Sequence, residues 1–273
     1  MKPRPFDYIR PDTVEEAIAL LAEYGEDARV LAGGQSLVPM LNLRLIEASA
    51  LIDISRIAAL DVIRDLGDRI EIGAAVTQNK LMAWPRLAEK LPLAAAVLPF
   101  VGHFQTRNKG TVCGSMAHAD PSSELPLALA VLGGEIVLQS RRGERVLAAG
   151  DFQKDMLTTA RAPDELIVAA RFPVANGPGV AFREVARRHG DFAIIAVAAV
   201  AEGKGAARLG VGGMAGTPVV RQVAVDGGVR NVVERLAAEL AGAEDLHASA
   251  AMRRDLLRNL APLAIAEAQR CAA

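Results

Sequence analysis

The sequence predicts a mixed α+β protein built from two or three structural units. Its 273 residues are enough for a sizeable core, and 51% of them are hydrophobic. Over residues 1–55, strand-like and helix-like stretches alternate, as in a small parallel β–α–β unit. Short strand-like stretches separated by turns that contain Gly and Asp follow, and this sequence pattern favours antiparallel pairing.

The first unit is expected to begin with an amphipathic helix. Thr13-Val14-Glu15-Glu16 is a capping box, and Gly25 stands where this helix should stop. Strands are expected at 29–32 and 51–54, with a helix near 37–43 between them. The order strand, helix, strand is what predicts the parallel pairing of this unit.

The middle of the chain is expected to hold short strands and two apolar helices. The strand ranges are 60–64, 69–77, 135–139 and 167–172, and the helix ranges are 81–98 and 125–132. Residues 175–179 (Ala-Asn-Gly-Pro-Gly) are the best linker candidate, because Gly and Pro interrupt regular structure. We therefore expect a first domain at 1–175, made of subdomains 1–55 and 56–175, and a second domain at 180–273.

The second domain is expected to contain three strands followed by helices. The strand candidates run over 181–187, 192–202 and 207–214. In the last helix, Pro262 should kink or interrupt the regular structure. The large apolar residues that fall on one face of this helix are Met252, Leu256, Leu260 and Leu263.

The composition excludes several classes of function. A formal net charge of −1 argues against a broad nucleic-acid surface, and 4% aromatic residues argue against stacking platforms for single strands. The N-terminus has no apolar signal core, and the longest apolar run, 192–201, is too short to span a bilayer. We therefore expect a cytoplasmic protein without a membrane span.

The two cysteines limit the redox chemistry that the chain can hold. Cys113 and Cys271 are far apart in sequence and suggest no disulfide framework. Two cysteines also cannot hold an iron–sulfur cluster, which typically takes four. If the protein handles electrons, its own electron carrier must therefore be organic.

A glycine-rich turn follows the strand expected at 29–32. There, Ala32-Gly33-Gly34-Gln35-Ser36-Leu37 combines two glycines, a hydroxyl and the start of an apolar helix-like stretch. Consecutive glycines let several backbone N–H groups converge on one point before a helix, and such a nest suits a phosphate. The segment is either the pyrophosphate site of a dinucleotide or an ordinary Gly-Gly turn between strand and helix.

A second glycine-containing stretch, 107–126, repeats these features and adds acidic residues. It contains Thr111-Val112-Cys113-Gly114-Ser115, whose hydroxyls and amides could meet phosphates. Asp120 or Glu124 could accept hydrogen bonds from ribose hydroxyls, or the segment 120–123 could simply cap the next helix. Neither stretch matches G-x-G-x-x-G or the P-loop pattern, so a Rossmann or P-loop site is not predicted.

Four separate segments, in order along the chain, resemble one protein family. They are Ala32-Gly33-Gly34-Gln35-Ser36-Leu37-Val38-Pro39 with Asn42-Leu43-Arg44-Leu45; Thr111-Val112-Cys113-Gly114-Ser115 with Ala119-Asp120-Pro121 and Glu124-Leu125-Pro126; Arg188-His189-Gly190-Asp191-Phe192-Ala193; and Gly216-Thr217-Pro218-Val219 with Asp245-Leu246-His247-Ala248-Ser249-Ala250. They are similar to segments of the FAD-binding medium subunit of molybdenum hydroxylases, the xanthine dehydrogenase and carbon monoxide dehydrogenase type. The resemblance runs from residue 5 onward to the C-terminus.

The resemblance implies an FAD-binding fold of the vanillyl-alcohol-oxidase/p-cresol-methylhydroxylase type. In that fold two α+β subdomains clamp an extended FAD, and a C-terminal domain with a three-stranded antiparallel sheet and helices closes over the flavin ring. By the same match, the first glycine segment holds the pyrophosphate, the second forms the opposite wall, Glu124 serves the ribose, and Leu166 and Phe192 lie near the ring. The residues implied in cofactor binding are Leu31, Ala32, Gly33, Gly34, Gln35, Ser36, Leu37, Thr111, Val112, Cys113, Gly114, Ser115, Ala119, Asp120, Glu124, Leu166, Asp191 and Phe192.

The resemblance also implies the function of an electron-transferring flavoprotein subunit. In such complexes a large molybdopterin subunit hydroxylates the substrate, and a small subunit with two [2Fe–2S] clusters passes electrons to noncovalent FAD. The electrons then leave for an external acceptor, and the implied assembly is a dimer of heterotrimers. The chain itself would hold no metal and no catalytic acid or base, because the cofactor carries the redox step. Two other hypotheses stay open: a flavin-free scaffold subunit and a stand-alone FAD-dependent oxidase.

Three local features leave alternatives open. Where the family often has Gly-Gly-Asn, this chain has Cys113-Gly114-Ser115, so Cys113 is either a small apolar filler or a redox thiol. His189-Gly190-Asp191 is either involved with the flavin or a surface turn. His118-Ala119-Asp120 lacks a further ligand at short spacing, so it predicts no metal site.

Overall fold

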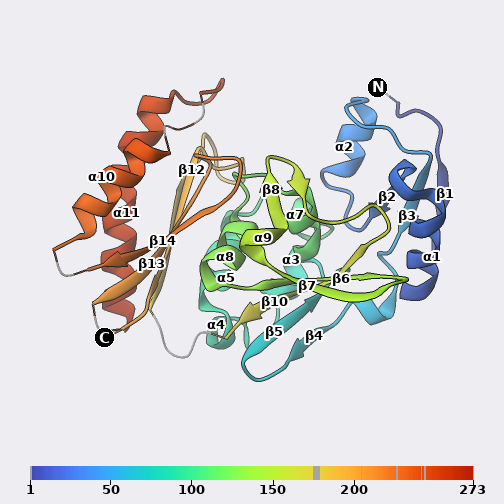
Figure 1. Ribbon diagram of the computed structural model, residues 1–273, viewed down its shortest axis with the longest axis horizontal. Coiled ribbons are helices and arrows are strands. Elements are labelled where there is room, and N and C mark those ends of the chain that lie inside the picture. Colours follow the sequence, from blue (N-terminus) through green and yellow to red (C-terminus); the bar gives the residue numbers. More distant parts are fainter. Residues whose placement is uncertain are drawn as a thin grey trace.

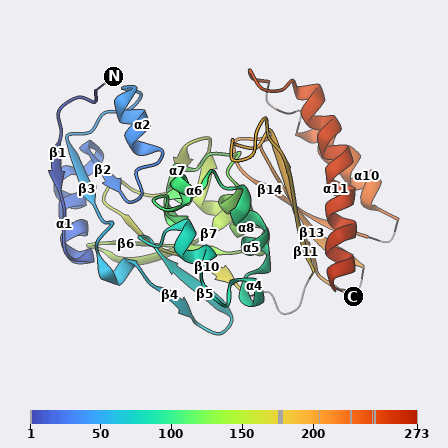
Figure 2. The ribbon, with the colours of Figure 1, turned by 180° about the vertical axis from the view of Figure 1, so that it is seen from behind.

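The computed structural model describes residues 2–174, 179–203, 205–225, 227–240, 242 and 244–272 (Figure 1). It confirms a mixed α+β protein, and its described part contains three main sheets. Figures 1 and 2 show one unit after another along the molecule, with the N-terminal unit at one end and two C-terminal helices at the other. Of the expected linker at 175–179, residues 175–178 lie outside the described residues.

The N-terminal unit is a three-stranded parallel sheet with two helices. Its strands, in spatial order, are β1 (Asp7–Ile9), β3 (Ala50–Asp53) and β2 (Ala28–Leu31), and its helices are α1 (Val14–Tyr24) and α2 (Leu37–Asn42). The Thr13 Oγ1 accepts from the backbone N–H of Glu16 at 3.1 Å, which confirms the expected helix start. Strand β1 was not expected, because three mostly exposed residues show no alternating pattern.

The central unit is a five-stranded antiparallel sheet with short helices packed on it. Its strands, in spatial order, are β4 (Ile63–Asp65), β5 (Arg69–Gly73), β10 (Leu166–Pro173), β6 (Glu135–Ser140) and β7 (Gly143–Ala148). Its helices are α3 (Gln78–Met82), α4 (Leu87–Lys90), α5 (Pro92–Val97), α6 (Phe104–Arg107), α7 (Val112–His118), α8 (Glu124–Leu132) and α9 (Ala149–Phe152). A separate ribbon pairs β8 (Gln153–Asp155) with β9 (Thr158–Thr159). The antiparallel pairing predicted for this region is confirmed.

The prediction of a single long helix at 81–98 is wrong. The segment from Gln78 to Val97 forms three short helices, α3, α4 and α5. Pro85 and Pro92 interrupt the helix, because proline lacks a backbone N–H and its ring clashes with the preceding turn. Pro92 is itself the first residue of α5, a position where no intrahelical donor is needed.

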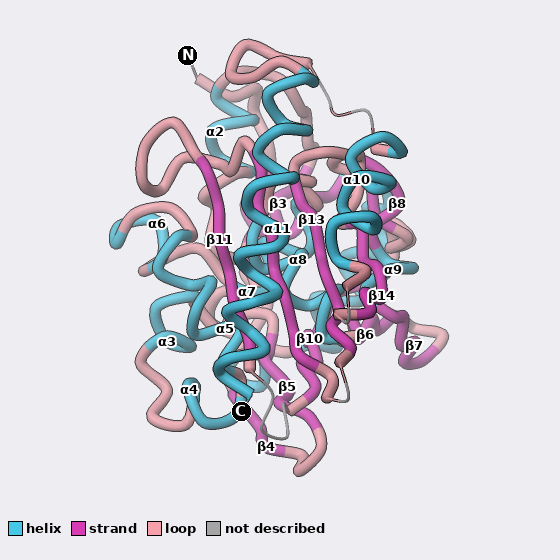
Figure 3. The backbone as a smooth tube through the Cα atoms, turned by 90° about the vertical axis from the view of Figure 1, so that its left-hand side faces the viewer, coloured by secondary structure: helices cyan, strands magenta, loops and turns pink. Residues whose placement is uncertain are grey.

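The C-terminal unit is an antiparallel sheet with four strands, which corrects the expected three. The strands, in spatial order, are β11 (Val180–Val185), β12 (Ile195–Ala201), β13 (Ala206–Gly212) and β14 (Val219–Ala224). Strand β14 was missed because it lies at the sheet edge, where the exposed Arg221 and Gln222 break the apolar pattern. Figure 3 shows α10 (Val229–Glu239) and α11 (Ala250–Ala272) lying over one face of this sheet.

Helix α11 runs from Ala250 to Ala272 without interruption at Pro262. Half of its six buried residues are alanines, among them Ala261 and Ala264, whereas Met252 and Leu263 are exposed. A stripe of alanines is easily overlooked when a helix face is assigned from its large apolar residues. None of the helices in the described ranges combines the length and apolarity that crossing a bilayer requires.

Two buried clusters attach the C-terminal sheet to its neighbours. One cluster lies between this sheet and helices α10 and α11. The other cluster runs through the central unit and includes Phe182, Ala196 and Ala198 of the C-terminal sheet. These residues lie on the opposite face of that sheet, and this face packs on α5 and α8. Because both faces are buried, the sheet is held against the central unit. This packing places the loop between β11 and β12 beside the two glycine segments, residues 32–37 and 108–115.

Candidate functional site

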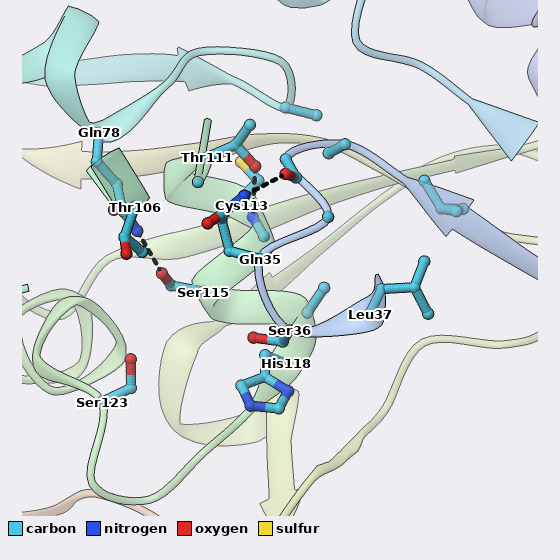
Figure 4. Close-up of a pocket in the computed structure, with 18 of the residues that line it drawn as sticks. Gln35, Ser36, Leu37, Gln78, Thr106, Thr111, Cys113, Ser115, His118 and Ser123 are labelled. Carbon is cyan, nitrogen blue, oxygen red and sulfur yellow. Dashed lines mark hydrogen bonds between the residues drawn. The ribbon is translucent and has the colours of Figure 1, made fainter. Parts of the chain in front are cut away.

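Two cavities flank the first glycine segment. The main cavity has a volume of about 420 Å³ and the side cavity about 700 Å³, both in the size range of small-molecule sites. Residues 32–35 and Thr111 line both cavities. Figure 4 shows residues of both glycine segments, such as Ser36 from the first and Ser115 from the second, around the main cavity.

The first glycine loop (residues 32–37) presents a row of free hydrogen-bond donors. The backbone N–H groups of residues 33–37 donate to no other group in the described ranges. Gly34 has a φ of +69°, a conformation that L side chains rarely adopt, and it turns the chain between β2 and α2. Because α2 has only six residues, the N–H groups themselves, rather than a helix dipole, provide the attraction for an anion.

The two glycine segments are in direct backbone contact. A Cβ on Gly33 would lie 2.8 Å from both the Gly110 Cα and the Lys109 carbonyl carbon, and closer still to the Lys109 carbonyl oxygen. The Gly110 carbonyl in turn accepts from the backbone N–H of Gln78 at 2.8 Å. Glycine is therefore required at position 33 by the close approach of a second backbone, in addition to any ligand.

The second glycine loop (residues 108–115) offers hydroxyl groups to the main cavity. The Thr111 Oγ1 accepts from the Gly114 N–H at 2.9 Å, so that amide is already used within the chain. The Ser115 Oγ accepts from the Gln78 Nε2 at 3.0 Å. Neither hydroxyl donates its own hydrogen to an acceptor among the described residues, so both hydrogens are available to a ligand.

Most of the residues predicted from the sequence come together in the main cavity. Those that line it are Ala32, Gly33, Gly34, Gln35, Ser36, Leu37, Thr111, Cys113, Gly114, Ser115, Glu124, Leu166 and Phe192. Leu31 lines the side cavity instead. The four that line neither cavity are Val112, Ala119, Asp120 and Asp191. A role in cofactor binding stays a prediction for all of these residues, inside and outside the cavities.

The four residues outside the cavities have other surroundings. Val112 and Ala119 are fully buried. The Asp120 Oδ1 accepts from the backbone N–H of Ser122 at 2.8 Å, as expected for a turn that leads into α8. Asp191 forms an ion pair with Arg188 at 3.1 Å. The carboxylates of Asp120 and Asp191 are therefore already engaged within the chain.

Glu124 provides the carboxyl group of the main cavity. It is the first residue of α8 and is only 3% exposed. Burial, together with the charge of Asp120, raises the pKa of Glu124 to about 7, although its own backbone N–H acts in the opposite direction. Burial also lowers the pKa of the neighbouring cavity residue His118. A carboxyl in this position can accept hydrogen bonds from the hydroxyl groups of a ligand.

Two arginines bring positive charge to the main cavity. Arg29 and Arg161 both line it. The Arg161 guanidinium donates to the carbonyl oxygens of Ala162 at 3.0 Å and Glu165 at 2.7 Å. Burial, followed by the charge of Arg29, lowers the pKa of Arg161. Two neighbouring cations in one cavity favour an anionic ligand.

The loop between β11 and β12 closes one side of the main cavity. Strand β12 begins at Ile195, so Phe192, expected as the first strand residue, belongs to the loop and is 54% exposed. Its ring centroid lies 6.4 Å from that of His118. Gly190, with φ of +84°, packs directly against His103. An exposed aromatic ring at the cavity wall offers a flat apolar surface to an aromatic ligand.

Sequence reasoning missed several polar residues of the main cavity. They are Arg29, Gln78, Thr106, Ser123 and Arg161. Arg29 and Ser123 lie within the segments described above and Thr106 directly precedes one of them, but Gln78 and Arg161 lie in stretches with no ligand-binding motif. Their place in the cavity depends on packing between distant parts of the chain, so no local signal could have indicated it.

Cys113 has the surroundings of an apolar filler. It is 2% exposed, and its thiol donates to the Ile72 carbonyl oxygen at 3.5 Å. Burial raises the pKa of this thiol to about 12, which keeps it protonated and unreactive at neutral pH. Cys271, near the end of α11, is exposed. These features support the filler interpretation over the redox one.

We expect iodoacetamide to alkylate Cys271 and to leave Cys113 unmodified in the folded chain. The reason is that alkylation requires an accessible thiolate, which burial denies to Cys113. Peptide mass spectrometry after a short exposure measures the result, and labelling in denaturant serves as the control in which both thiols react. Equal labelling of the two thiols in the native protein would contradict the interpretation.

Comparison with known proteins identifies the family. The family model described as the FAD binding domain in molybdopterin dehydrogenase matches residues 4–175. The 6-hydroxypseudooxynicotine dehydrogenase complex subunit alpha of Paenarthrobacter nicotinovorans is 42% identical over 201 residues, which are 73% of this chain and 68% of that one. The carbon monoxide dehydrogenase medium chain of Afipia carboxidovorans is 38% identical over 224 residues, or 80% and 78% of the two chains.

The three-dimensional structure agrees with these sequence matches. A chain of the carbon monoxide dehydrogenase from Hydrogenophaga pseudoflava, in a form that lacks the Mo-pyranopterin moiety, matches with a TM-score of 0.94 and 31% identity over 100% of both chains. The fold and the site therefore define an FAD-binding oxidoreductase component. This chain belongs to the family of FAD-binding domains in molybdopterin dehydrogenases, and it is a homologue of carbon monoxide dehydrogenase medium chains. The resemblance seen in the sequence is thereby confirmed.

Proposed function

We propose that this chain is the flavin-carrying medium subunit of a heteromeric molybdenum hydroxylase. Its role is to hold noncovalent FAD on the electron path from the [2Fe–2S] clusters of a small subunit to an external acceptor. The observation that carries the proposal is the row of free backbone N–H groups at residues 33–37, on a loop that borders both cavities. Family membership supports the same cofactor.

The groups present in the cavities fit the chemical parts of FAD. The free N–H groups of residues 33–37 suit the pyrophosphate, which needs several donors on one side. Arg29 and Arg161 add the positive charge that a phosphate pair requires. The Glu124 carboxyl suits ribose hydroxyls, and the exposed ring of Phe192 suits the flat isoalloxazine.

When bound, FAD supplies the electron-transfer chemistry, and the chain supplies binding, orientation and electrostatics. The first glycine loop holds the anionic part, and the Thr111 and Ser115 hydroxyls donate from the opposite wall. The buried Leu166 and Cys113 give that cavity an apolar lining that excludes water. No acid or base from this chain is needed for such a role.

The remaining parts of the proposal concern the architecture and the partners. We assign subdomains 1–55 and 56–175 to an FAD-binding domain of the vanillyl-alcohol-oxidase/p-cresol-methylhydroxylase type, and 180–273 to a domain that closes over the flavin ring. The partners are a large molybdopterin subunit and a small iron–sulfur subunit in a dimer of heterotrimers. Relatives named as a complex subunit and as medium chains support a multi-subunit assembly.

Isolation of the native complex tests the proposed function. We expect two further chains to co-purify with this one, together with molybdenum, iron and a flavin that denaturation releases as free FAD. Absorbance spectroscopy and metal analysis measure these components. A complex without flavin would support the scaffold hypothesis, and turnover of an organic substrate by this chain alone would support a stand-alone oxidase; either result contradicts the proposal.

A further inference from the structure

Gln78 is a buried polar residue in the wall of the main cavity that no motif indicated. It is the first residue of α3 and is 4% exposed. Its side-chain Nε2 donates to the Ser115 Oγ at 3.0 Å, as Figure 4 shows. Its Oε1 is buried and has no hydrogen-bond partner among the described residues. A buried amide with one unsatisfied oxygen needs an explanation, because it costs free energy.

The backbone around Gln78 is built to keep this amide in place. The Gln78 N–H donates to the Gly110 carbonyl at 2.8 Å. A Cβ on Gly110 would come within 3.1 Å of the Gln78 Oε1, so the glycine leaves room for the amide. The preceding residue, Thr77, caps α3 by accepting from the Lys80 N–H at 3.1 Å. The side chain is thus fixed between α3 and the second glycine loop.

The hydrogen bond from Gln78 determines what the Ser115 hydroxyl can do. A hydroxyl has one hydrogen to donate and two lone pairs to accept with. Because the Gln78 Nε2 already donates to the Ser115 Oγ, the Ser115 hydrogen must point to another acceptor. The described part of the chain provides no such acceptor, and Ser115 lines the main cavity. The hydroxyl is therefore left as a donor to a ligand.

We propose that Gln78 is a positioning residue of the cofactor site, which holds the Ser115 hydroxyl as a donor to an anionic oxygen of the FAD pyrophosphate. This inference rests on the proposed function and adds a specific role for two residues within it. A hydroxyl that accepts a hydrogen bond is polarised by it, which strengthens the bond that the hydroxyl donates to an ionised acceptor. A carboxylate in place of the amide would reverse the direction of the hydrogen bond between the two side chains, because the carboxylate would accept the Ser115 hydrogen.

A double-mutant cycle on the full-length chain tests the role of Gln78. We expect Gln78→Glu to weaken FAD binding at least tenfold, and Gln78→Met, whose thioether sulfur is only a weak acceptor, to weaken it only about threefold. In a Ser115→Ala background, Gln78→Glu should cost clearly less than in the parent chain, because the two residues act together. Flavin fluorescence titration measures the dissociation constants, and thermal melting of the apoprotein checks that each variant folds.

A matched substitution and three outcomes keep the test decisive. Gln222→Glu, at an exposed position of β14, introduces the same charge away from the cavity and should bind FAD like the parent chain. The inference is overturned if Gln78→Glu binds like the parent chain, if Gln78→Met loses as much as Gln78→Glu, or if the Gln78→Glu penalty is unchanged by Ser115→Ala. Failure of the parent chain to bind FAD would instead overturn the proposed function.

Discussion

Replacing Gly33 with alanine should remove nearly all FAD from the protein. A Cβ at this position would lie within 2.8 Å of backbone atoms of Lys109 and Gly110, which cannot move aside as a flexible side chain can. The two glycine loops must then separate. The hydrogen-bond donors on the two sides of the main cavity can then no longer contact the same FAD molecule. Because each hydrogen bond to a charged group contributes about 1.5–3 kcal/mol and more than one is lost, we expect FAD affinity to fall at least about 100-fold. The flavin-to-protein ratio after purification measures the loss.

Gly150→Ala is the matched control for this substitution. A Cβ on Gly150, in α9, would meet no atom within 4 Å, so this variant should keep its flavin. Circular dichroism of both variants separates loss of the cofactor from loss of the fold. If Gly33→Ala retained a full complement of FAD, the contact between the glycine loops would not be needed for binding.

Replacing Glu184 with glutamine should make the protein more stable in alkaline solution. Glu184 lies on β11, and its Oε2 is buried without a hydrogen-bond partner in the described part of the chain. Burial, followed by the charge of Glu124, raises the pKa of Glu184 to about 8, compared with an ordinary value of 4.5. Between these two pH values the folded state holds a proton that the unfolded chain releases. The stability of the fold therefore decreases as the pH rises through this window.

Glutamine keeps the shape of the side chain and carries no charge at any pH. We expect Glu184→Gln to have little effect near pH 5 and to raise the free energy of unfolding by about 1–2 kcal/mol at pH 9, a value reduced for partial solvent screening. Thermal melting between pH 5 and pH 9, with both proteins in the same flavin state, measures the difference. Glu23→Gln, at an exposed position of α1, controls for the change in net charge. A stabilisation that did not depend on pH would contradict this account of Glu184.

The parts of the fold that sequence patterns predicted correctly are those specified by local chemistry. The cap at Thr13 and the apolar strand ending at Leu31 are examples, because each depends on residues within one turn or one strand. The errors arose where local and longer-range signals conflict. Residues 81–98 are apolar enough for one helix, but two prolines divide them. Strand β14 has a polar outer face and is stabilised mainly by its pairing with β13.

The candidate site divides in the same way between local and tertiary contributions. The order of glycines and hydroxyls in residues 32–37 and 111–115 indicated a possible phosphate site, because a phosphate nest is made from consecutive residues. FAD and the family were indicated by the resemblance of four segments along the chain. That order could not reveal Gln78 or Arg161, whose positions in the main cavity come from the packing of distant segments. Nor could it reveal that Glu184 on β11 lies close to Glu124 on α8.

By itself, the sequence determined the class of the protein, its α+β character and the two segments that meet at the main cavity. Only the tertiary structure decided that the backbone at Gly33 abuts the backbone at Lys109, and that the Gln78 amide donates a hydrogen bond to the Ser115 hydroxyl. The physical reason is that motifs record which groups are available within a few residues of one another. The direction in which a hydrogen bond points, and the pKa of a buried carboxyl, depend on neighbours that only the packed chain brings together.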